Sequence, residues 1–173
     1  MKFHIEQAIE ILSQTPATIK SLLENLSDEW IFAEENRNDW NAFDVVGHLI
    51  HADETDWMPR AEVILSQGEN PTFEAFDRYG QFEKSKGKTL SELLEEFAEI
   101  RKQSLDNLQR MNITEDKLNL KAIHPELGEV TLENLLSTWV VHDLTHIRQI
   151  VTSLAKKYSE NVGVWKQYLS ILK

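Results

Sequence analysis

Apolar residues recur at helical spacing along most of this chain, and this periodicity is the feature that most restricts its fold. The clearest run follows Thr131, where one helical face carries Leu132, Leu135, Leu136, Trp139, His142, His146, Ile150 and Leu154. Only 6 glycines and 4 prolines interrupt the 173 residues, and no segment alternates apolar and polar residues for long enough to indicate a sheet. We therefore predict an all-α fold.

The first half of the chain predicts two long helices. The first runs from Phe3 to Leu26, with a bend expected at Pro16. The second begins after Asn41, a favourable N-cap residue, and ends at Gly68. Within it, Pro59 predicts a kink or a break, because proline lacks the amide hydrogen and crowds the preceding turn.

The second half predicts two more helices with recognisable N-terminal caps. Thr89 followed by Glu92 fits a capping box, and apolar residues continue at helical spacing as far as Met111. The opposite face of this third helix is nearly all charged. Thr131 caps the fourth helix, after a predicted loop that contains His124.

Two other segments complete the predicted architecture. Residues 69–88 are irregular and rich in aromatic side chains, which indicates a long connection packed across the bundle. Residues 164–172 predict a short amphipathic helix that closes one end. Together the segments predict a four-helix bundle with a long crossover connection and a short extra C-terminal helix, in a single domain spanning residues 1–173.

Charge and cysteine content exclude several classes of function. With 29 acidic and 18 basic side chains the formal net charge is -11, which opposes binding to nucleic acid and to anionic membrane surfaces. The chain has no cysteine, so a metal would be held by nitrogen and oxygen ligands. No run of about 18 apolar residues and no secretion signal occurs, so we expect a cytoplasmic protein without a membrane span.

His142 and His146 are the strongest candidate metal ligands. They stand four residues apart on the apolar face of the fourth helix, so their imidazoles can converge on one ion. The alternative is a pair of core histidines hydrogen-bonded to carbonyls or carboxylates. The motif HDLTH is not the HExxH of metalloproteases, because Asp143 replaces the general-base glutamate.

A third ligand is available from the second helix, which carries His48 and His51. Spacing alone does not choose between them, but His48 has apolar neighbours on its helical face and is the better inward candidate. His51 lies one step round the helix, where we expect a half-buried surface histidine near Asp53 or Glu54.

Two segments resemble the signature segments of a known family. Trp40 precedes His48 by eight positions within WNAFDVVGHLIHAD, and the pair His142 and His146 lies within WVVHDLTHIRQI. This combination resembles the DinB/YfiT-like superfamily over nearly the whole chain. The resemblance implies a four-helix bundle, often a homodimer, in which His48, His142 and His146 hold one divalent ion with exchangeable solvent completing the shell. It implies zinc or nickel, with iron, manganese and copper as alternatives.

The resemblance also implies an activity. Relatives transfer or isomerise with a low-molecular-weight thiol such as bacillithiol or mycothiol, and some are described as hydrolase-like. A metal held by three neutral imidazoles can lower the pKa of bound water to about 7 or activate a carbonyl or thiol. Our leading hypothesis is a metal-dependent enzyme that acts on a small molecule, as a thiol S-transferase or a hydrolase.

Other residues near the histidines are not assigned as metal ligands or catalytic groups. We interpret Asp53, Glu54 and Asp143 as solvated charges rather than as acceptors that orient imidazoles. His124 precedes a proline in extended backbone, where a place as fourth ligand is an alternative that we do not favour. Trp40 and Trp139 are expected in the core rather than in a substrate pocket. The aromatic connection from Phe73 to Phe82 fits a pocket wall and core packing equally well.

Two other functions compete with a mononuclear enzyme. The first is a di-metal carboxylate bundle, which would need further inward carboxylates from Glu6, Glu10, Glu95 or Glu99. The second is a binding or interaction bundle without catalysis, which the sequence leaves open because a ligand set indicates binding rather than turnover.

Overall fold

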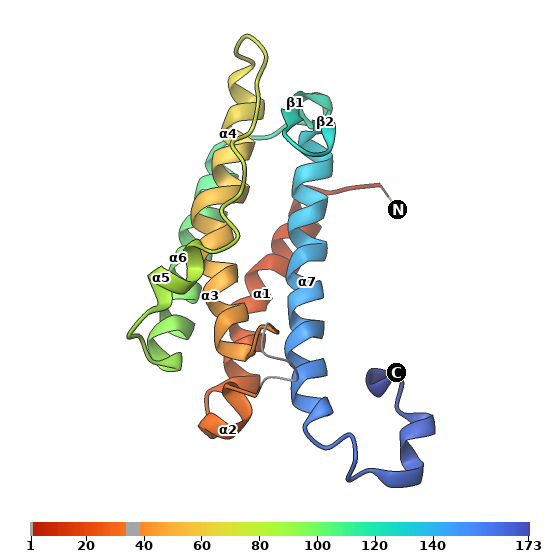
Figure 1. The fold of residues 1–173 in the computed structure, drawn as a ribbon. Helices are drawn as coiled ribbons and strands as arrows, with labels where there is room; N and C mark the ends of the chain where they lie inside the picture. Colours follow the sequence, from red (N-terminus) through yellow and green to blue (C-terminus); the bar gives the residue numbers. More distant parts are fainter. Residues whose placement is uncertain (1, 34–38) are drawn as a thin grey trace.

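The computed structural model describes residues 2–33 and 39–173 and contains a bundle of long helices (Figure 1). Three of its long elements are the helices α1 (Ile5–Leu23), α6 (Leu90–Arg110) and α7 (Leu132–Lys156). The fourth is a continuous helical run made of α3 (Ala42–Ala52), the π-helical turn η1 (Asp53–Trp57) and α4 (Met58–Ser66). Its short elements are α2 (Asp28–Ile31), α5 (Gly80–Ser85), the strands β1 (Lys121–His124) and β2 (Gly128–Thr131), and the 3₁₀ turns η2 (Glu115–Asn119), η3 (Gly163–Tyr168) and η4 (Ser170–Leu172). The predicted four-helix bundle is confirmed.

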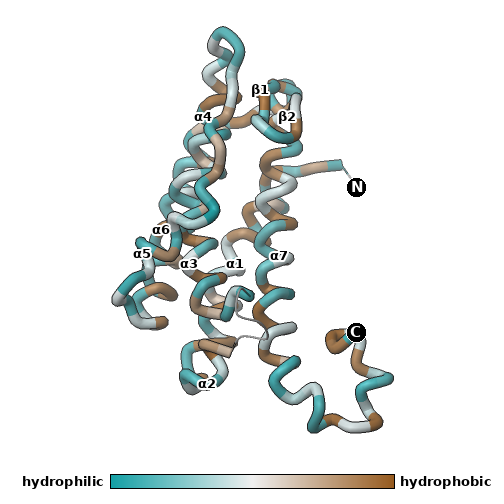
Figure 2. Tube along the Cα trace, in the orientation of Figure 1, coloured by the Kyte–Doolittle hydropathy of each residue, from teal (hydrophilic) through white to brown (hydrophobic). Residues whose placement is uncertain are grey.

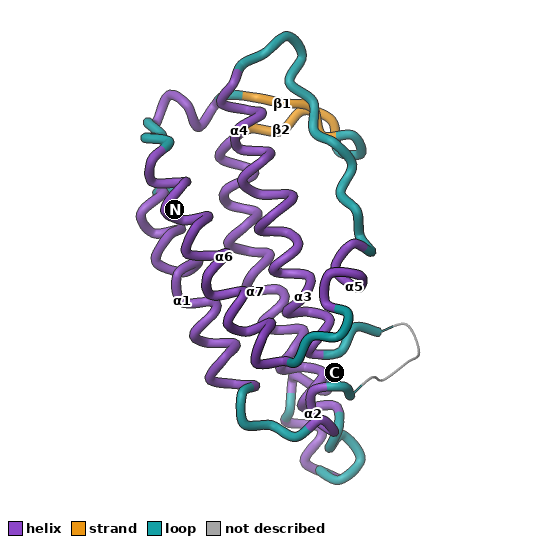
Figure 3. The backbone as a smooth tube through the Cα atoms, turned by 90° about the vertical axis from the view of Figure 1, so that its left-hand side faces the viewer, coloured by secondary structure: helices purple, strands orange, loops and turns teal. Residues whose placement is uncertain are grey.

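The helices are connected in an order unlike that of a simple up-and-down bundle. Helices α1 and α3 each pack against both α6 and α7, so α1 and α3 lie diagonally across the bundle. After α4 the chain returns along the outside of the bundle through α5, so that α6 runs in the same direction as α3 (Figures 1 and 3). This return is the predicted long crossover connection.

The three predicted helix caps are present. The Asn41 side chain accepts the Asp44 amide at 3.0 Å, and Thr89 and Glu92 form the expected capping box. The Thr131 side chain accepts the Asn134 amide at 3.1 Å, again within a capping box. Each such cap contributes about 1 kcal/mol to helix stability, which explains why these helix starts are well predicted.

The loop predicted around His124 is instead a small antiparallel hairpin. Strands β1 and β2 pair from Lys121 opposite Thr131 to His124 opposite Gly128. Gly128 has φ of 77°, a left-handed conformation that other residues rarely adopt. Strands of four residues are too short to show a clear alternation, so the sequence pattern does not predict them.

Two other irregular segments differ in detail from the prediction. The connection over residues 69–88 contains α5, and of its aromatic residues Phe73 is buried whereas Tyr79 and Phe82 are exposed. Helix α5 packs on α3 where Gly47 leaves room, since a Cβ atom there would lie 2.4 Å from Ser85 Oγ. The predicted short C-terminal helix is present as the 3₁₀ turns η3 and η4, and none of their residues is buried.

Pro59 is accommodated without a break in the helical run. It lies in the first turn of α4, and the wide turn η1 immediately precedes it. A π-helical turn contains one residue more than an α-helical turn, so it takes up the strain of a proline that neither donates an amide nor fits the preceding turn. The run ends at Gln67, which has φ of 46°, rather than at the predicted Gly68.

Apolar side chains gather in two clusters inside the bundle, and brown and teal segments alternate along its helices (Figure 2). One cluster is built around Leu12, Trp57 and Trp139, and the other around Phe97 and Ile150. None of the described helices is long and apolar enough to span a membrane.

A buried ionic cluster lies where the two apolar clusters meet. Arg101 is 1% exposed, and its guanidinium stands over the rings of Phe97 and Trp139 at 5.0 and 5.2 Å from the ring centres. Its nitrogens donate to both oxygens of Asp53, at 2.6 and 3.0 Å, and to both oxygens of Asp143. Although burial opposes charging, these two carboxylates raise the pKa of Arg101 above its ordinary value.

Candidate metal centre

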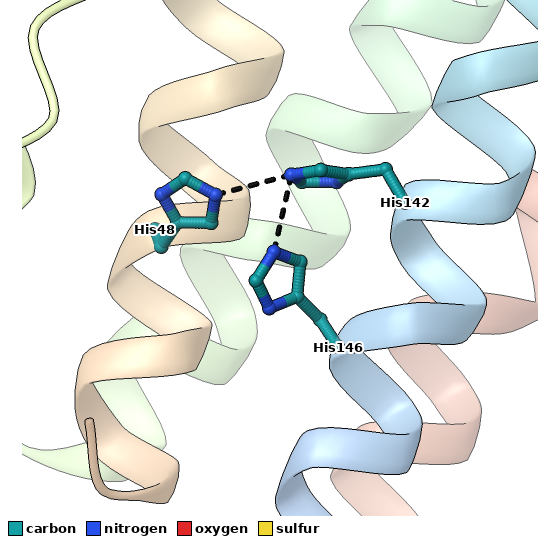
Figure 4. A group of neighbouring side chains, drawn as sticks. All are labelled: His48, His142 and His146. Carbon is teal, nitrogen blue, oxygen red and sulfur yellow. Dashed lines mark hydrogen bonds between the residues drawn. The ribbon is translucent and has the colours of Figure 1, made fainter. Parts of the chain in front are cut away.

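The structure brings His48, His142 and His146 together between α3 and α7 (Figure 4). His142 Nε2 lies 3.1 Å from His48 Nε2 and 3.1 Å from His146 Nε2. One ligand atom of each residue lies within 4.8 Å of the others. The four-residue spacing on α7 places two of the imidazoles on one helical face, and α3 supplies the third from across the bundle.

The separations between the nitrogens fit a shared metal ion. Ligand nitrogens at about 2.0–2.1 Å from a tetrahedral zinc ion stand roughly 3.3 Å apart, close to the 3.1 Å between His142 Nε2 and each of the other two Nε2 atoms. Three imidazoles leave further coordination positions for solvent or substrate, as catalytic sites require. The donor set and its spacing could therefore hold a divalent ion.

Two glutamines orient the imidazoles, and sequence reasoning did not find them. His48 Nδ1 donates to Gln81 Oε1 at 3.4 Å, and His146 Nδ1 donates to Gln149 Oε1 at 2.8 Å. With Nδ1 carrying the proton, the Nε2 lone pairs of both residues face the shared centre, as a metal ligand requires. Gln149 could have been found from its three-residue spacing to His146, whereas Gln81 lies in the crossover connection, far away in sequence.

The histidines are held in their neutral form. Burial lowers the pKa of His48 to about 4, assisted by the neighbouring His146. Burial also lowers the pKa of His142 to about 2 and, to a smaller extent, that of His146. Neutral imidazoles keep their lone pairs free, so protons compete with a metal at this centre only at acidic pH.

The metal-free protein should lose stability as the pH falls from about 6.5 towards 4. In this range the unfolded state binds protons on histidine side chains that the folded state keeps neutral, so acidification favours unfolding. We expect the free energy of unfolding from urea titrations to fall less steeply with acidification in His48→Gln than in the unchanged protein. The exposed His4 gives a matched control, because His4→Gln should leave the slope unchanged. Equal slopes for His48→Gln and the unchanged protein would contradict the burial argument.

Aromatic rings enclose the three histidines. Trp40 lies 4.7 Å from His48 between ring centres and stacks on His146 at 6.2 Å with an interplanar angle of 18°. Phe76 meets the edge of His48 at 5.7 Å, and Trp57 meets His142 at 5.0 Å. Trp40 therefore belongs to the candidate site and also packs against the apolar core as predicted, and Trp139 is buried in the core.

The other two candidate histidines have different environments. His51 is 4% exposed and its Nε2 donates to the Asp77 carbonyl at 3.0 Å, so it is buried against the crossover connection and not half-buried at the surface. His124 lines the same cavity as the three clustered histidines, but its Nδ1 accepts the amides of Glu126 and Leu127 at 3.1 and 3.2 Å. It is not part of the histidine cluster in the described residues.

Two of the three acids predicted to be solvated are in fact buried. Asp53 is 2% exposed, Asp143 is 0% exposed, and both bind Arg101. Burial raises the pKa of Asp53 to about 6, against the opposing effect of the guanidinium. Glu54 is exposed and pairs with Lys84. Each acid lies four residues after a buried apolar residue of its own helical run, Asp53 after Leu49 and Asp143 after Trp139, so ordinary helical spacing already places both on inward faces.

The di-metal carboxylate alternative is wrong. It requires inward carboxylates on the first and third long helices, and all four candidates are exposed: Glu6, Glu10, Glu95 and Glu99. Among the described residues, the group of histidine and acidic side chains close enough to share an ion is the three-histidine cluster.

The histidines open into a cavity of about 550 Å³. Asp56 and Arg60 line it on the α3–α4 side, and Arg78 lines it from the crossover connection. A second hollow of about 720 Å³ is lined by residues of α7, among them Arg148 and Gln149, and Trp40 lines both. The smaller cavity contains the histidines and has the size of a small-molecule site.

Comparison with known proteins supports the fold. The chain matches the DinB superfamily over residues 11–150. Its structure is similar to that of YfiT from Bacillus subtilis, described as a probable metal-dependent hydrolase with an unusual four-helix bundle topology. The TM-score is 0.70 and the identity 22%, over 91% of this chain and 87% of YfiT.

A partial sequence match is to a ribosomal protein. The chain is 36% identical over 94 residues to small ribosomal subunit protein uS19 of Aquifex pyrophilus, which corresponds to 54% of this chain and 42% of that protein. The chain thus spans less than half the length of this relative. The superfamily match, in contrast, covers α3 and most of α1 and α7, including all three clustered histidines. On this evidence the chain belongs to the DinB superfamily.

Proposed function

We propose that this protein is a divalent-metal-dependent hydrolase that acts on a small molecule, with His48, His142 and His146 as the metal ligands. The observation that carries the proposal is the convergence of three Nε2 atoms, buried and neutral, at the wall of a cavity of about 550 Å³. Zinc and nickel are the proposed ions, because imidazole suits both. The likeness to YfiT, a probable metal-dependent hydrolase, supports the reaction class.

The residues around the centre would contribute binding and orientation. A divalent ion held by three neutral imidazoles supplies a Lewis acid and a source of nucleophilic water near neutral pH. Gln81 and Gln149 hold the imidazoles in the tautomer that ligates. Trp40 and Phe76 cover the imidazole rings and limit the access of bulk water to the centre.

Metal removal and restoration test the proposal. Protein stripped with a chelator should neither hydrolyse nor transfer, and reloading with zinc or nickel should restore turnover of members of a panel of small esters, amides and phosphoesters. The measured quantity is the initial rate of substrate turnover per equivalent of bound metal. Full loading without turnover across the panel would count against a hydrolase and favour a binding bundle without catalysis.

Thiol S-transfer is a second candidate function. A metal centre of this kind also accepts a thiolate, and the chain has no cysteine of its own, so the thiol would be a small molecule such as bacillithiol. Metal-dependent consumption of that thiol with an electrophile, in the absence of ester or amide hydrolysis, would favour the transferase. Hydrolysis that needs no thiol would favour the hydrolase.

We also propose that nucleic acid is not a partner, whatever the name of the partial relative. The formal net charge of -11 repels phosphate backbones, and an RNA-binding protein needs a basic surface. Micromolar binding to RNA of mixed sequence at physiological salt would contradict this proposal. The homodimer that the family resemblance implies stays a prediction.

A further inference from the structure

We propose that the substrate carries a carboxylate, and that the guanidinium of Arg60 binds this group while the reacting part of the substrate lies at the histidines. The inference rests on the proposed metal-dependent function and adds a substrate class to it. Arg60 lines the histidine cavity, and its side chain is only 12% exposed. In a cavity of this kind, charge-assisted hydrogen bonds from a nearly buried guanidinium to an anionic ligand are stronger than they are in water.

The wide turn η1 brings Arg60 onto the helical face that carries His48. Twelve residues of regular α-helix correspond to about 3.3 turns, which would place Arg60 roughly a third of a turn away from His48. The extra residue of the π-helical turn reduces the effective spacing to eleven residues, or about 3.1 turns. His48, Ala52, Asp56 and Arg60 accordingly line one cavity.

The guanidinium of Arg60 is held by Asp56 at its Nε edge. Arg60 Nε lies 2.6 Å from Asp56 Oδ1, and the guanidinium carbon stands 5.0 Å above the centre of the Phe73 ring. Asp56 pairs with the Nε edge. In the proposed complex the substrate carboxylate meets the two terminal amino groups end-on, because their fork has the shape that a carboxylate accepts.

The charges in the cavity suit an anion although the whole protein is acidic. The other charged side chains that line it are Asp56, Arg78 and Glu126, and the latter two form an exposed pair at 3.6 Å. Arg60 with Asp56 is neutral as a pair, and three neutral imidazoles add no charge of their own. A divalent ion would make the loaded cavity positive, in contrast to the net charge of -11 for the chain.

Hydroxamates test the inference because they bind zinc and nickel directly. We would load the protein with zinc and titrate it calorimetrically with the monohydroxamates of malonate, succinate, glutarate and adipate. Each would be compared with the neutral compound in which the free carboxylate is replaced by a carboxamide of the same shape. We expect at least one acid to bind about tenfold more tightly than its amide, which is the effect of one charge-assisted hydrogen-bonded pair.

Arginine variants locate the carboxylate. Arg60→Gln should abolish the preference for the acid, and Arg60→Lys, which keeps the charge but loses the fork, should retain part of it. Arg78→Gln in the same cavity and Arg148→Gln in the neighbouring hollow are matched controls that should keep it. Circular dichroism and the zinc content show that each variant is folded and loaded.

The outcomes separate this inference from the proposed function. If no hydroxamate binds the zinc-loaded protein, the centre is not open to ligands and the proposed function fails. If acids and amides bind equally, the centre is open but the carboxylate inference is overturned. A preference that survives in Arg60→Gln, or that disappears in Arg148→Gln, also overturns it, because the anion would then bind elsewhere.

Discussion

Replacing Arg101 by methionine should lower the free energy of unfolding by about 3–5 kcal/mol, the usual cost of leaving a buried charge without its partner. Asp53 and Asp143 are almost completely buried and rely on this guanidinium. Asp53 additionally accepts the Trp139 indole at 3.2 Å, which cannot replace an opposite charge. Urea denaturation at constant pH measures the loss.

The pH dependence of this loss identifies its cause. Burial already raises the pKa of Asp53 to about 6 in the unchanged protein, and the loss of Arg101 should raise it further. A carboxyl group whose pKa is higher in the folded than in the unfolded protein lowers the free energy of unfolding as the pH rises past its unfolded pKa. The variant should therefore be least stable at alkaline pH and regain stability near pH 5.

Two comparisons control the Arg101 experiment. Arg110→Met removes an exposed arginine from the same helix and should change stability by less than about 0.5 kcal/mol. The triple change Arg101→Met, Asp53→Asn, Asp143→Asn removes all the charges together and should regain part of the lost stability. A loss below 1 kcal/mol for Arg101→Met alone would show that the buried ion pairs do not stabilise the fold.

Periodicity and capping residues predicted the bundle, because both act within one helix. The caps at Asn41, Thr89 and Thr131 lie where the sequence places them. The wide turn η1 was not predicted, since the need for it arises from Pro59 and is met by a change of helix type rather than by the expected break.

The clustering of the three candidate ligands was predicted, but the residues around them were not. The spacing of His142 and His146 indicates convergence because a helix repeats nearly every four residues. Gln81 and Trp40 reach the same centre only through tertiary packing, which no local spacing encodes. Arg101 was not singled out in the sequence, and its burial depends on two carboxylates from other helices.

His142→Ala should abolish stoichiometric metal binding while leaving the protein folded. His142 is the central member of the cluster, with its Nε2 3.1 Å from both other Nε2 atoms. Loss of a partner that only orients a ligand costs 10–100-fold in metal affinity, so loss of a ligand should cost more than about 100-fold. The fold should tolerate the change, because the buried Nδ1 of His142 has no hydrogen-bond partner to lose. Metal content after gel filtration and zinc titration against a chelating indicator measure the effect.

Two further variants serve as controls for the effect of His142→Ala on metal binding. His51→Ala removes a buried histidine from the same helix as His48 and should keep one metal equivalent, because its Nε2 serves the Asp77 carbonyl and not the centre. Gln149→Leu should weaken binding by about 10–100-fold without abolishing it, since the imidazole of His146 loses its orienting acceptor. If His142→Ala keeps one metal equivalent, the ion is not held by the three converging Nε2 atoms. In that case the cluster would be a group of packed core histidines, and both the hydrolase proposal and the role of the cavity would fail with it.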